Sequence, residues 1–199
     1  LDDSAVSWYE RNASTGALTY GGMLQHVANV VDGLGIPTGV TLSVDGNHAY
    51  VGGKFNDTVS WYERNASTGA LTYGGTLQDA VSLGDPDQVT LSSDGNHLYV
   101  TAFPSNAVSW YERNASTGAL TYGGMLQGQV DGVFLPWGVT LSSDGNYAYV
   151  TTEWKSVSWY ERNVSTGALT YLGSLQGGAN GGDAFGVVLS ADENQVYAT

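Results

Sequence analysis

The sequence predicts an all-β fold, a β-propeller of four blades, and three observations lead to that prediction. A line of seventeen residues, VSWYERNASTGALTYGG, begins at Val6 and returns almost unchanged three times. Its tryptophan falls at positions 8, 61, 110 and 159, so the repeat is about 49 residues long. A second phrase, of the form GVTLSSDGNYAYVTT, runs in step with the first. Periods of this length are typical of propeller blades and of solenoids.

Each repeat contains four short stretches that are typical of β-strands. In one repeat they are 89–93, 97–101, 108–113 and 120–127, rich in Val, Tyr and Trp. Asp-Gly-Asn and Asn-Ala-Ser-Thr-Gly stand between them, and both are turn sequences. No stretch shows the i, i+3, i+4, i+7 spacing that a helix needs. Four antiparallel strands per repeat favour a propeller blade over a solenoid unit.

The chain is predicted to form one propeller domain over residues 1–199. Its four repeats are about 39–87, about 88–137, about 138–185, and a last one made of about 1–38 together with 186–199.

The two ends of the chain carry complementary parts of a blade. Residues 6–11 and Leu18–Gln25 resemble the third and fourth strands of a repeat, whereas 187–190 and 195–198 resemble the first and second. We therefore expect a ring that is closed when the N-terminal strands complete the C-terminal blade, because closure removes exposed sheet edges. A monomer is favoured, and a dimeric eight-bladed ring or a head-to-tail assembly is the alternative.

The motif L-S-x-D-G-x-x-x-Y-V-T, followed by V-S-W-Y-x-R-x-x-x-T-G-x-L, resembles the YVTN and lactonase-type β-propeller repeat of bacteria. The resemblance covers essentially the whole chain and implies a propeller fold. The family it implies includes lactone hydrolases alongside surface and periplasmic proteins. Its members commonly have seven blades, whereas this chain has material for four.

Composition narrows the classes of partner. With 19 acidic and 6 basic residues, the formal net charge is −13, which argues against nucleic acid and anionic membrane surfaces. The chain has no cysteine and therefore no disulfide scaffold. No apolar run approaches the roughly 20 residues of a membrane span. We expect an extracellular or periplasmic protein, and a chain beginning at Leu1 is expected to be a mature product or an excerpt.

The repeated line is interpreted as scaffold. Its Trp and Tyr are expected to fill the space between blades, and each Arg is expected to meet a carboxylate on a neighbouring strand or blade. The Asp-Gly pairs are expected to form turns. Asn12, Asn65, Asn114 and Asn163 lie in Asn-x-Ser sequons, so they are also candidate glycosylation sites.

The variable connections between strands are interpreted as the working surface, because loops on a rigid scaffold commonly bind ligands. They combine acidic residues with aromatic residues outside the repeated line, which suits a carbohydrate, a cation or a protein ligand. The predicted ligand-binding residues are Asp85, Asp87, Phe103, Trp137, Trp154 and Lys155.

Calcium is the one cofactor that the composition can support. Four aspartates recur ahead of the inner strands, and loop carboxylates near an axis can hold a hard cation. The predicted ligands are Asp32, Asp85, Asp131 and Asp183.

The residues alone favour a non-enzymatic binding, adhesion or structural module with no catalytic residues. The sequence has no G-x-S-x-G, no cysteine, and no metalloprotease or phosphate-loop motif. Two alternatives remain: a lactonase-like hydrolase, and a structural subunit that assembles by completing blades between chains.

Overall fold

The computed structural model describes residues 4–25, 33–79, 81–177 and 184–199. Within these ranges the secondary structure consists of β-strands and three single turns of 3-10 helix. The strands form three antiparallel sheets of four strands and two of two strands. The prediction of an all-β propeller with four strands per blade is confirmed.

Each complete blade is built from consecutive strands in chain order. The first blade contains β3 (Pro37–Leu42), β4 (His48–Gly53), β5 (Thr58–Arg64) and β6 (Leu71–Gln78). The second contains β7 (Pro86–Leu91), β8 (His97–Ala102), β9 (Ala107–Arg113) and β10 (Leu120–Gln127). The third contains β11 (Pro136–Leu141), β12 (Tyr147–Thr152), β13 (Ser156–Arg162) and β14 (Leu169–Gln176).

Two half blades complete the chain. The N-terminal one pairs β1 (Ala5–Arg11) with β2 (Leu18–Gln25), and the C-terminal one pairs β15 (Val187–Leu189) with β16 (Val196–Ala198). The 3-10 turns are η1 (Lys54–Asn56), η2 (Gln129–Asp131) and η3 (Glu153–Lys155).

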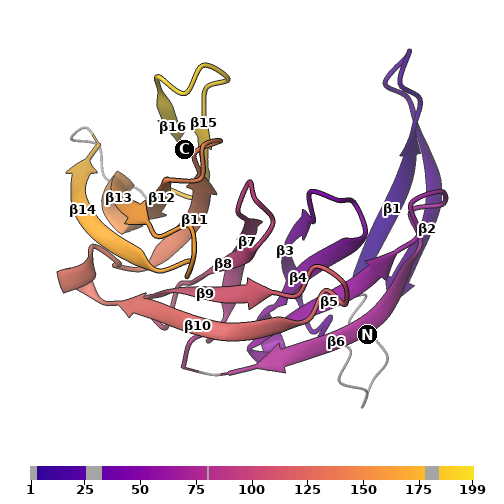
Figure 1. The fold of residues 1–199 in the computed structure, drawn as a ribbon, viewed down its shortest axis with the longest axis horizontal. Coiled ribbons are helices and arrows are strands. Elements are labelled where there is room, and N and C mark those ends of the chain that lie inside the picture. Colours follow the sequence, from indigo (N-terminus) through magenta and orange to yellow (C-terminus); the bar gives the residue numbers. More distant parts are fainter. Residues whose placement is uncertain (1–3, 26–32, 80, 178–183) are drawn as a thin grey trace.

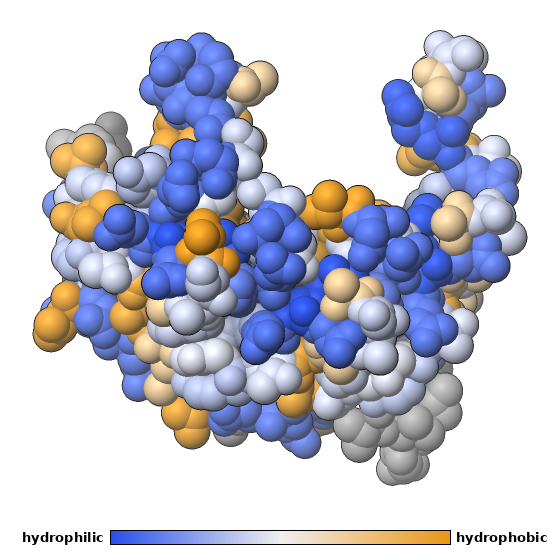
Figure 2. All heavy atoms as spheres, viewed as in Figure 1, coloured by the Kyte–Doolittle hydropathy of each residue, from blue (hydrophilic) through white to orange (hydrophobic). Residues whose placement is uncertain are grey.

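The sheets follow one another along an arc (Figure 1). The inner strands β3, β7, β11 and β15 contact one another in series, and β6, β10 and β14 lie on the outside. The half blades project from opposite ends of the arc as separate arms (Figure 2). The expected closure of the ring within the chain is therefore not seen. In the described structure β1 pairs only with β2 and β16 only with β15, so the two half blades do not form one sheet.

The strand registers place the variable connections that the structure describes at one edge of the sheets. In the first blade Pro37 pairs with Gly53, Gly53 with Thr58, and Thr58 with Gln78. These residues adjoin the connections that differ between repeats, and we call this side the variable edge. The Asp-Gly and Asn-x-Ser turns lie on the opposite side, which we call the constant edge.

The hydrophobic core lies between blades. Tyr50 of the first blade packs in one cluster with Leu98 and Tyr111 of the second blade, and an equivalent cluster joins the second blade to the third. The third-strand tyrosines Tyr62, Tyr111 and Tyr160 are at most 1% exposed. These contacts confirm that the repeated aromatic line is scaffold.

The Gly-Gly pair of the repeat is explained by the tryptophan beside it. A side chain on Gly123 would place its Cβ 2.7 Å from Cδ1 of Trp110, and one on Gly124 would place it 2.5 Å from Cζ2. The register of β9 and β10 also shifts at this point. The indole therefore lies across both glycines. The copy with Trp159 has Leu172-Gly173 and keeps only the second glycine, where a Cβ would lie 2.6 Å from Cζ2 of Trp159.

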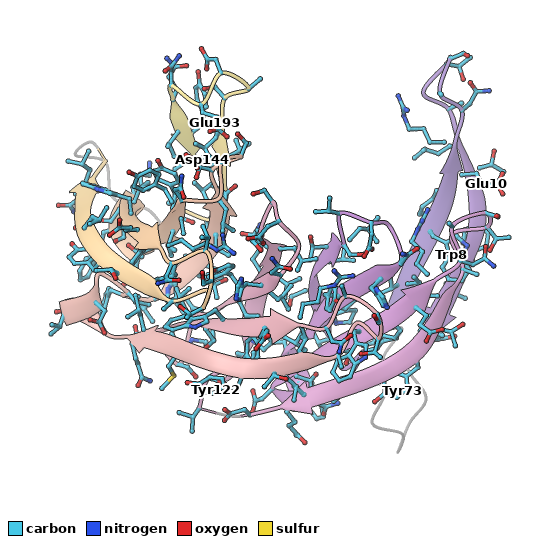
Figure 3. The ribbon with its side chains drawn as sticks, in the orientation of Figure 1. Trp8, Glu10, Tyr73, Tyr122, Asp144 and Glu193 are labelled. Atoms are coloured by element: carbon cyan, nitrogen blue, oxygen red, sulfur yellow. The ribbon has the colours of Figure 1, made fainter. Side chains whose placement is uncertain are left out.

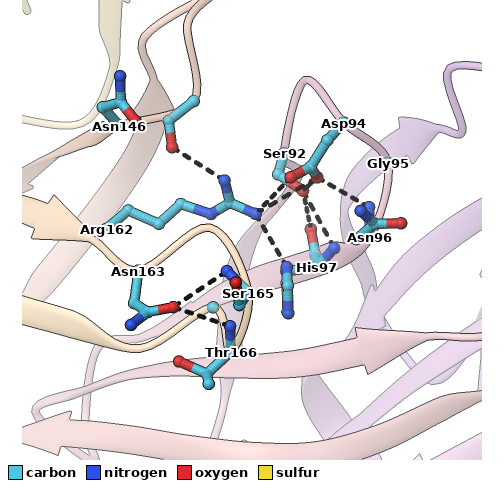
Figure 4. A network of polar contacts seen from close by, with 12 residues as sticks. Ser92, Asp94, Gly95, Asn96, His97, Asn146, Arg162, Asn163, Ser165 and Thr166 are labelled. Carbon is cyan, nitrogen blue, oxygen red and sulfur yellow. Dashed lines mark hydrogen bonds and ion pairs between the residues drawn. The ribbon is translucent and has the colours of Figure 1, made fainter.

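One arginine ties the third blade to the second (Figure 4). Arg162 of the third blade donates to Asp94 Oδ2 at 3.0 Å and to the Tyr99 hydroxyl at 2.7 Å, both in the second blade. It also donates to His97 Nδ1 at 2.8 Å and to its own blade at Gly145 O, at 2.9 Å. This arginine clamp confirms the prediction that the repeated Arg meets a carboxylate on a neighbouring blade.

The same clamp joins the second blade to the first. Arg113 donates to Asp45 Oδ2 at 2.9 Å, to the Tyr50 hydroxyl at 2.6 Å, to His48 Nδ1 at 3.0 Å and to Gly95 O at 3.2 Å. The arginine side chain is 3% exposed. Burial first, and the adjacent arginine second, lower the pKa of His48, so this imidazole stays neutral at neutral pH.

Among the described residues, no helix is long and apolar enough to cross a membrane.

Candidate functional site at the start of the inner strands

The inner strands begin at the variable edge, and their second position differs in every blade. It is Thr38 in β3, Asp87 in β7 and Trp137 in β11, and Phe185 stands at the matching place before β15. The rest of each strand is nearly constant, as the three copies of Val-Thr-Leu show. A rigid and repeated strand therefore presents a different side chain at the same place in each blade.

Asp87 is the charged member of this set. Its Oδ1 accepts from Lys54 Nζ at 3.1 Å, and its Oδ2 accepts from the backbone N–H of Phe103 at 3.1 Å. The Asp87 side chain is 13% exposed and that of Lys54 is 32% exposed. Burial raises the pKa of Asp87; the Lys54 and Phe103 bonds oppose that rise without cancelling it, and nearby Asp85 adds to it.

Aromatic rings extend the site from Asp87 across two further blades. The centroids of Phe103 and Trp137 are 4.2 Å apart, and those of Trp137 and Phe185 are 4.8 Å apart. The indole Nε1 of Trp137 is buried and has no hydrogen-bond partner within the described part of the protein. We call Lys54, Asp87, Phe103, Trp137 and Phe185 the inner-strand site.

The backbone before each complete inner strand is held in an unusual conformation. Ile36, Asp85 and Leu135 each precede a proline and have φ between 47° and 51°, a region that side chains disfavour. A side chain from the preceding connection supports each of them. Asp57 Oδ1 accepts from Asp85 N at 2.9 Å, and Asn106 Oδ1 accepts from Leu135 N at 2.8 Å. Such strain persists where the surroundings enforce it, and it is common at functional sites.

The structure brings together four of the six predicted ligand-binding residues. Asp87, Phe103 and Trp137 belong to the inner-strand site, and Asp85 lies beside it. Lys54 and Phe185 were not among the six. Both lie in connections that differ between repeats, and only the fold shows that they adjoin the inner strands.

Trp154 and Lys155 lie elsewhere. Trp154 stacks on Phe134 with centroids 4.9 Å apart, beside a cavity of about 280 Å³ that Glu153 also lines. Lys155 lines a different cavity, between the third blade and the C-terminal half blade. Among the described residues, the ring contact of Trp154 and the cavity lined by Lys155 do not involve the inner-strand site.

The predicted calcium ligands are only partly described. Asp32 and Asp183 lie outside the described residues. Asp131 ends η2, where its Oδ2 accepts from Gln127 N at 3.4 Å, and Asp85 lies beside Asp87. Within the described ranges, no group of three or more acidic or histidine side chains could hold a metal ion.

The sequon asparagines lie in exposed turns at the constant edge. In each turn the asparagine Oδ1 accepts two backbone N–H groups, as Asn114 does from Ser116 at 2.9 Å and from Thr117 at 3.1 Å. The turn alone therefore accounts for a repeated asparagine here.

Known structures share this architecture. A putative 6-phosphogluconolactonase from Bacteroides uniformis superposes with a TM-score of 0.79 at 16% identity, covering 98% of this chain and 57% of that one. The periplasmic gluconolactonase of Pseudomonas aeruginosa gives 0.74 at 18% identity, covering 98% and 56%. A protein from Lactobacillus plantarum gives 0.77 at 20% identity, covering 98% and 57%. At these identities the likeness establishes the fold.

The chain thus spans little more than half the length of these similar proteins. No curated protein matches it in sequence.

Residues 2–129 match the family described as Lactonase, 7-bladed beta-propeller. This match, together with the gluconolactonase neighbours, overturns the expectation of a non-enzymatic binding, adhesion or structural module. The expectation was wrong because it relied on the absence of short catalytic motifs, and that absence does not exclude a hydrolase. The match covers well over half of the chain, so the chain belongs to the lactonase family of seven-bladed β-propellers.

Proposed function

We propose that the propeller to which this chain contributes hydrolyses sugar lactones, and that ring opening takes place at the inner-strand site. The family match supports the reaction class. The observation that supports the location is the Lys54–Asp87 pair at 3.1 Å, beside aromatic rings contributed by other blades. Faces of aromatic rings suit the apolar face of a sugar, and paired charges suit its polar groups.

Asp87 is the proposed general base. A base works best when its pKa lies near the operating pH, and burial moves the pKa of Asp87 upward in that direction. The carboxylate takes a proton from water as the water oxygen bonds to the lactone carbonyl carbon. The bond from that carbon to the ring oxygen then breaks, and the ring oxygen takes up a proton to become a hydroxyl group.

Lys54 is the proposed electrostatic partner. Its ammonium group lies 3.1 Å from Asp87 Oδ1, so it can also approach a carbonyl oxygen that is attacked beside that carboxylate. Positive charge at the place where an oxyanion develops lowers the barrier.

Charge favours an uncharged lactone over a phosphorylated one. The net charge of the chain is −13, and the carboxylates of Asp85 and Asp87 lie near the ammonium group of Lys54. Anion recognition commonly uses several arginine or lysine donors. We therefore propose an aldonolactone without phosphate as the substrate class. The acidic composition supports a compartment outside the cytoplasm.

A lactone panel tests this function. Glucono-δ-lactone and its 6-phosphate are offered to the purified chain, and acid release is followed in a pH-stat with spontaneous hydrolysis subtracted. We expect hydrolysis above the spontaneous rate for the uncharged lactone, with a smaller kcat/KM for the phosphate. Trp154→Ala, outside the inner-strand site, should keep the activity. Rates equal to the spontaneous rate for every lactone would contradict the proposal.

A further inference from the structure

A cavity of about 280 Å³ opens at the variable edge of the third blade, apart from the inner-strand site. Its walls come from η2 and the residues after it, from η3, and from strands β13 and β14. All of these segments lie within or between the complete second and third blades. The volume is near the lower end of the range of about 300–1,000 Å³ that is typical of ligand pockets, which suits a ligand with one small ring.

An exposed aromatic platform forms one side of this cavity. The Trp154 side chain is 54% exposed, and its ring lies on that of Phe134 with the centroids 4.9 Å apart and the planes 31° apart. The backbone of Trp154 has φ 60° and ψ 32°, a left-handed conformation that bulky residues rarely adopt. Strain of this kind is common where a protein holds a ligand. The open face of an indole suits the apolar face of a sugar ring.

Polar groups without partners line the rest of the cavity. Among the described residues, the side chains of Gln129, Glu153 and Ser156 make no hydrogen bond or ion pair. They offer an amide, a carboxylate and a hydroxyl, which together can both donate and accept hydrogen bonds. The hydroxyl groups of a sugar also donate and accept, so the lining suits them.

A buried hydroxyl group behind the cavity also lacks a partner. The Tyr160 side chain is fully buried, and its hydroxyl makes no hydrogen bond within the described part of the protein. The Ser158 hydroxyl beside it donates to Gly132 O at 2.7 Å instead. Because buried polar groups are hydrogen-bonded in the great majority of cases, the Tyr160 hydroxyl indicates a partner from outside these residues.

The preceding repeat shows which group is missing. There the Tyr111 hydroxyl is hydrogen-bonded to the Ser82 hydroxyl at 3.0 Å. In the third blade Gly132 stands at the place of Ser82, since both accept a bond from the third-strand serine at their carbonyl oxygen, and Gly132 brings no hydroxyl. Gly132 lines the cavity, which places the Tyr160 hydroxyl at the inner end of the cavity.

A tyrosine of the fourth strand forms the outer wall. Tyr171 is the equivalent of Tyr73 and Tyr122, which Figure 3 shows on the outer strands β6 and β10. Those two side chains are 45% and 50% exposed, whereas Tyr171 is half-buried. A Cβ on Gly132 would collide with the Tyr171 ring, so the glycine makes room for this wall.

We propose that this cavity binds one neutral pyranose unit, with the sugar ring on Trp154 and its hydroxyl groups bonded to Glu153 and Gln129. One hydroxyl group, directly or through a water molecule, reaches the Tyr160 hydroxyl. The carboxylate of Glu153 and the net charge of −13 disfavour an acidic sugar. Among the described residues, no group of acidic or histidine side chains could hold a metal ion here instead.

The proposed sugar site is an accessory one. No residue of the inner-strand site lines it, so it holds a sugar unit without taking part in ring opening.

Methyl pyranosides of glucose, galactose and mannose are the probes, each titrated into the purified protein labelled with nitrogen-15. The indole N–H signal of Trp154 is assigned from its loss in Trp154→Phe. We expect at least one glycoside to shift this signal with a dissociation constant on the order of 1 mM, as is usual for so small a ligand. Absence of a shift with all three glycosides at tenfold higher concentration would overturn the proposal.

Tyr160→Phe and Tyr111→Phe form a matched pair, because they remove the same hydroxyl in successive repeats. Tyr160→Phe removes a hydroxyl without a partner among the described residues, so it should fold normally and weaken glycoside binding by about threefold to tenfold. Tyr111→Phe breaks the bond to Ser82 and should leave glycoside binding unchanged. Equal affinities in the wild type and in Tyr160→Phe would contradict the proposed site.

Trp154→Ala tests the aromatic platform, and Phe55→Ala is its control. Phe55 is an aromatic residue in the corresponding connection of the first blade, and it is 76% exposed. Saturation-transfer spectra of the glycoside should show binding weakened at least tenfold in Trp154→Ala and unchanged in Phe55→Ala. Wild-type affinity in Trp154→Ala would refute the stacking of the sugar on this ring.

The charge of the ligand is tested with the uronate form of the glycoside that binds best. It should bind at least fivefold more weakly than the neutral form, and equal or tighter binding would contradict a neutral ligand. These measurements follow binding alone, so their outcome does not depend on whether the chain hydrolyses lactones.

Discussion

Replacing Arg113 with methionine removes a complete arginine clamp and should destabilise the propeller strongly. The side chain is 3% exposed and its guanidinium contacts Asp45, Tyr50, His48 and Gly95 O. Breaking a buried ion pair costs about 3–5 kcal/mol. The Asp45 side chain is 37% exposed, so water can solvate its carboxylate once the arginine is removed. We therefore expect the loss of unfolding free energy to lie at the lower end of this range, about 3 kcal/mol. For a chain of this size, that loss lowers Tm by about 6–12 °C.

Glu112→Gln is the control, because Glu112 is the exposed neighbour of Arg113 and its replacement also removes one charge, of the opposite sign. It should leave the free energy of unfolding within about 0.5 kcal/mol of the wild type. Urea unfolding is followed by circular dichroism and by tryptophan fluorescence, so that a loss confined to one interface is detected. Equal midpoints for Arg113→Met and Glu112→Gln would refute the conclusion that the clamp holds the blades together.

Two further predictions concern the scaffold. Trp110→Ala should lower the free energy of unfolding by about 3–5 kcal/mol because it is a large-to-small change in the core, whereas Trp154→Ala should change it by about 0.5 kcal/mol or less. Thermal melts of the two variants test this prediction. Equal melting temperatures would contradict the core role of Trp110. The pKa values of His48 and His97 are both lowered, by burial first and by the clamp arginines second. Their contribution to stability should therefore be complete above about pH 6.5, the unfolded value, and be lost as the pH falls toward the lowered folded values. Urea unfolding midpoints at a series of pH values measure this loss of stability. If the double variant His48→Gln/His97→Gln shows the same dependence of the midpoint on pH as the wild type, the loss is due to other groups.

The propeller could be predicted from the sequence because each blade is a local pattern repeated at a fixed interval. Turn residues mark the strand ends, and each Trp recurs with a glycine that makes room for its indole. Closure could not be predicted in the same way. It depends on the angle between blades, which the volumes of side chains from two repeats determine together.

The site was only partly predictable, for a related reason. Variation at the variable edge identified Asp87, Phe103 and Trp137 as candidates, but nothing local shows that Lys54 pairs with Asp87. The two residues are 33 positions apart and belong to different blades. The same holds for the clamp, in which Arg113 meets Asp45 at a separation of 68 residues.

The activity of Asp87→Asn tests the central claim most directly. The asparagine keeps an acceptor for Phe103 N and removes a carboxylate whose ionised form is disfavoured by burial, so the fold should remain intact. The initial rate of glucono-δ-lactone hydrolysis is compared with that of the wild type and of Asp131→Asn, which changes an aspartate outside the inner-strand site. We predict that Asp87→Asn loses about 100-fold or more of the catalysed rate, as the loss of a general base does, while Asp131→Asn keeps it. A folded Asp87→Asn variant with the wild-type rate would contradict the account.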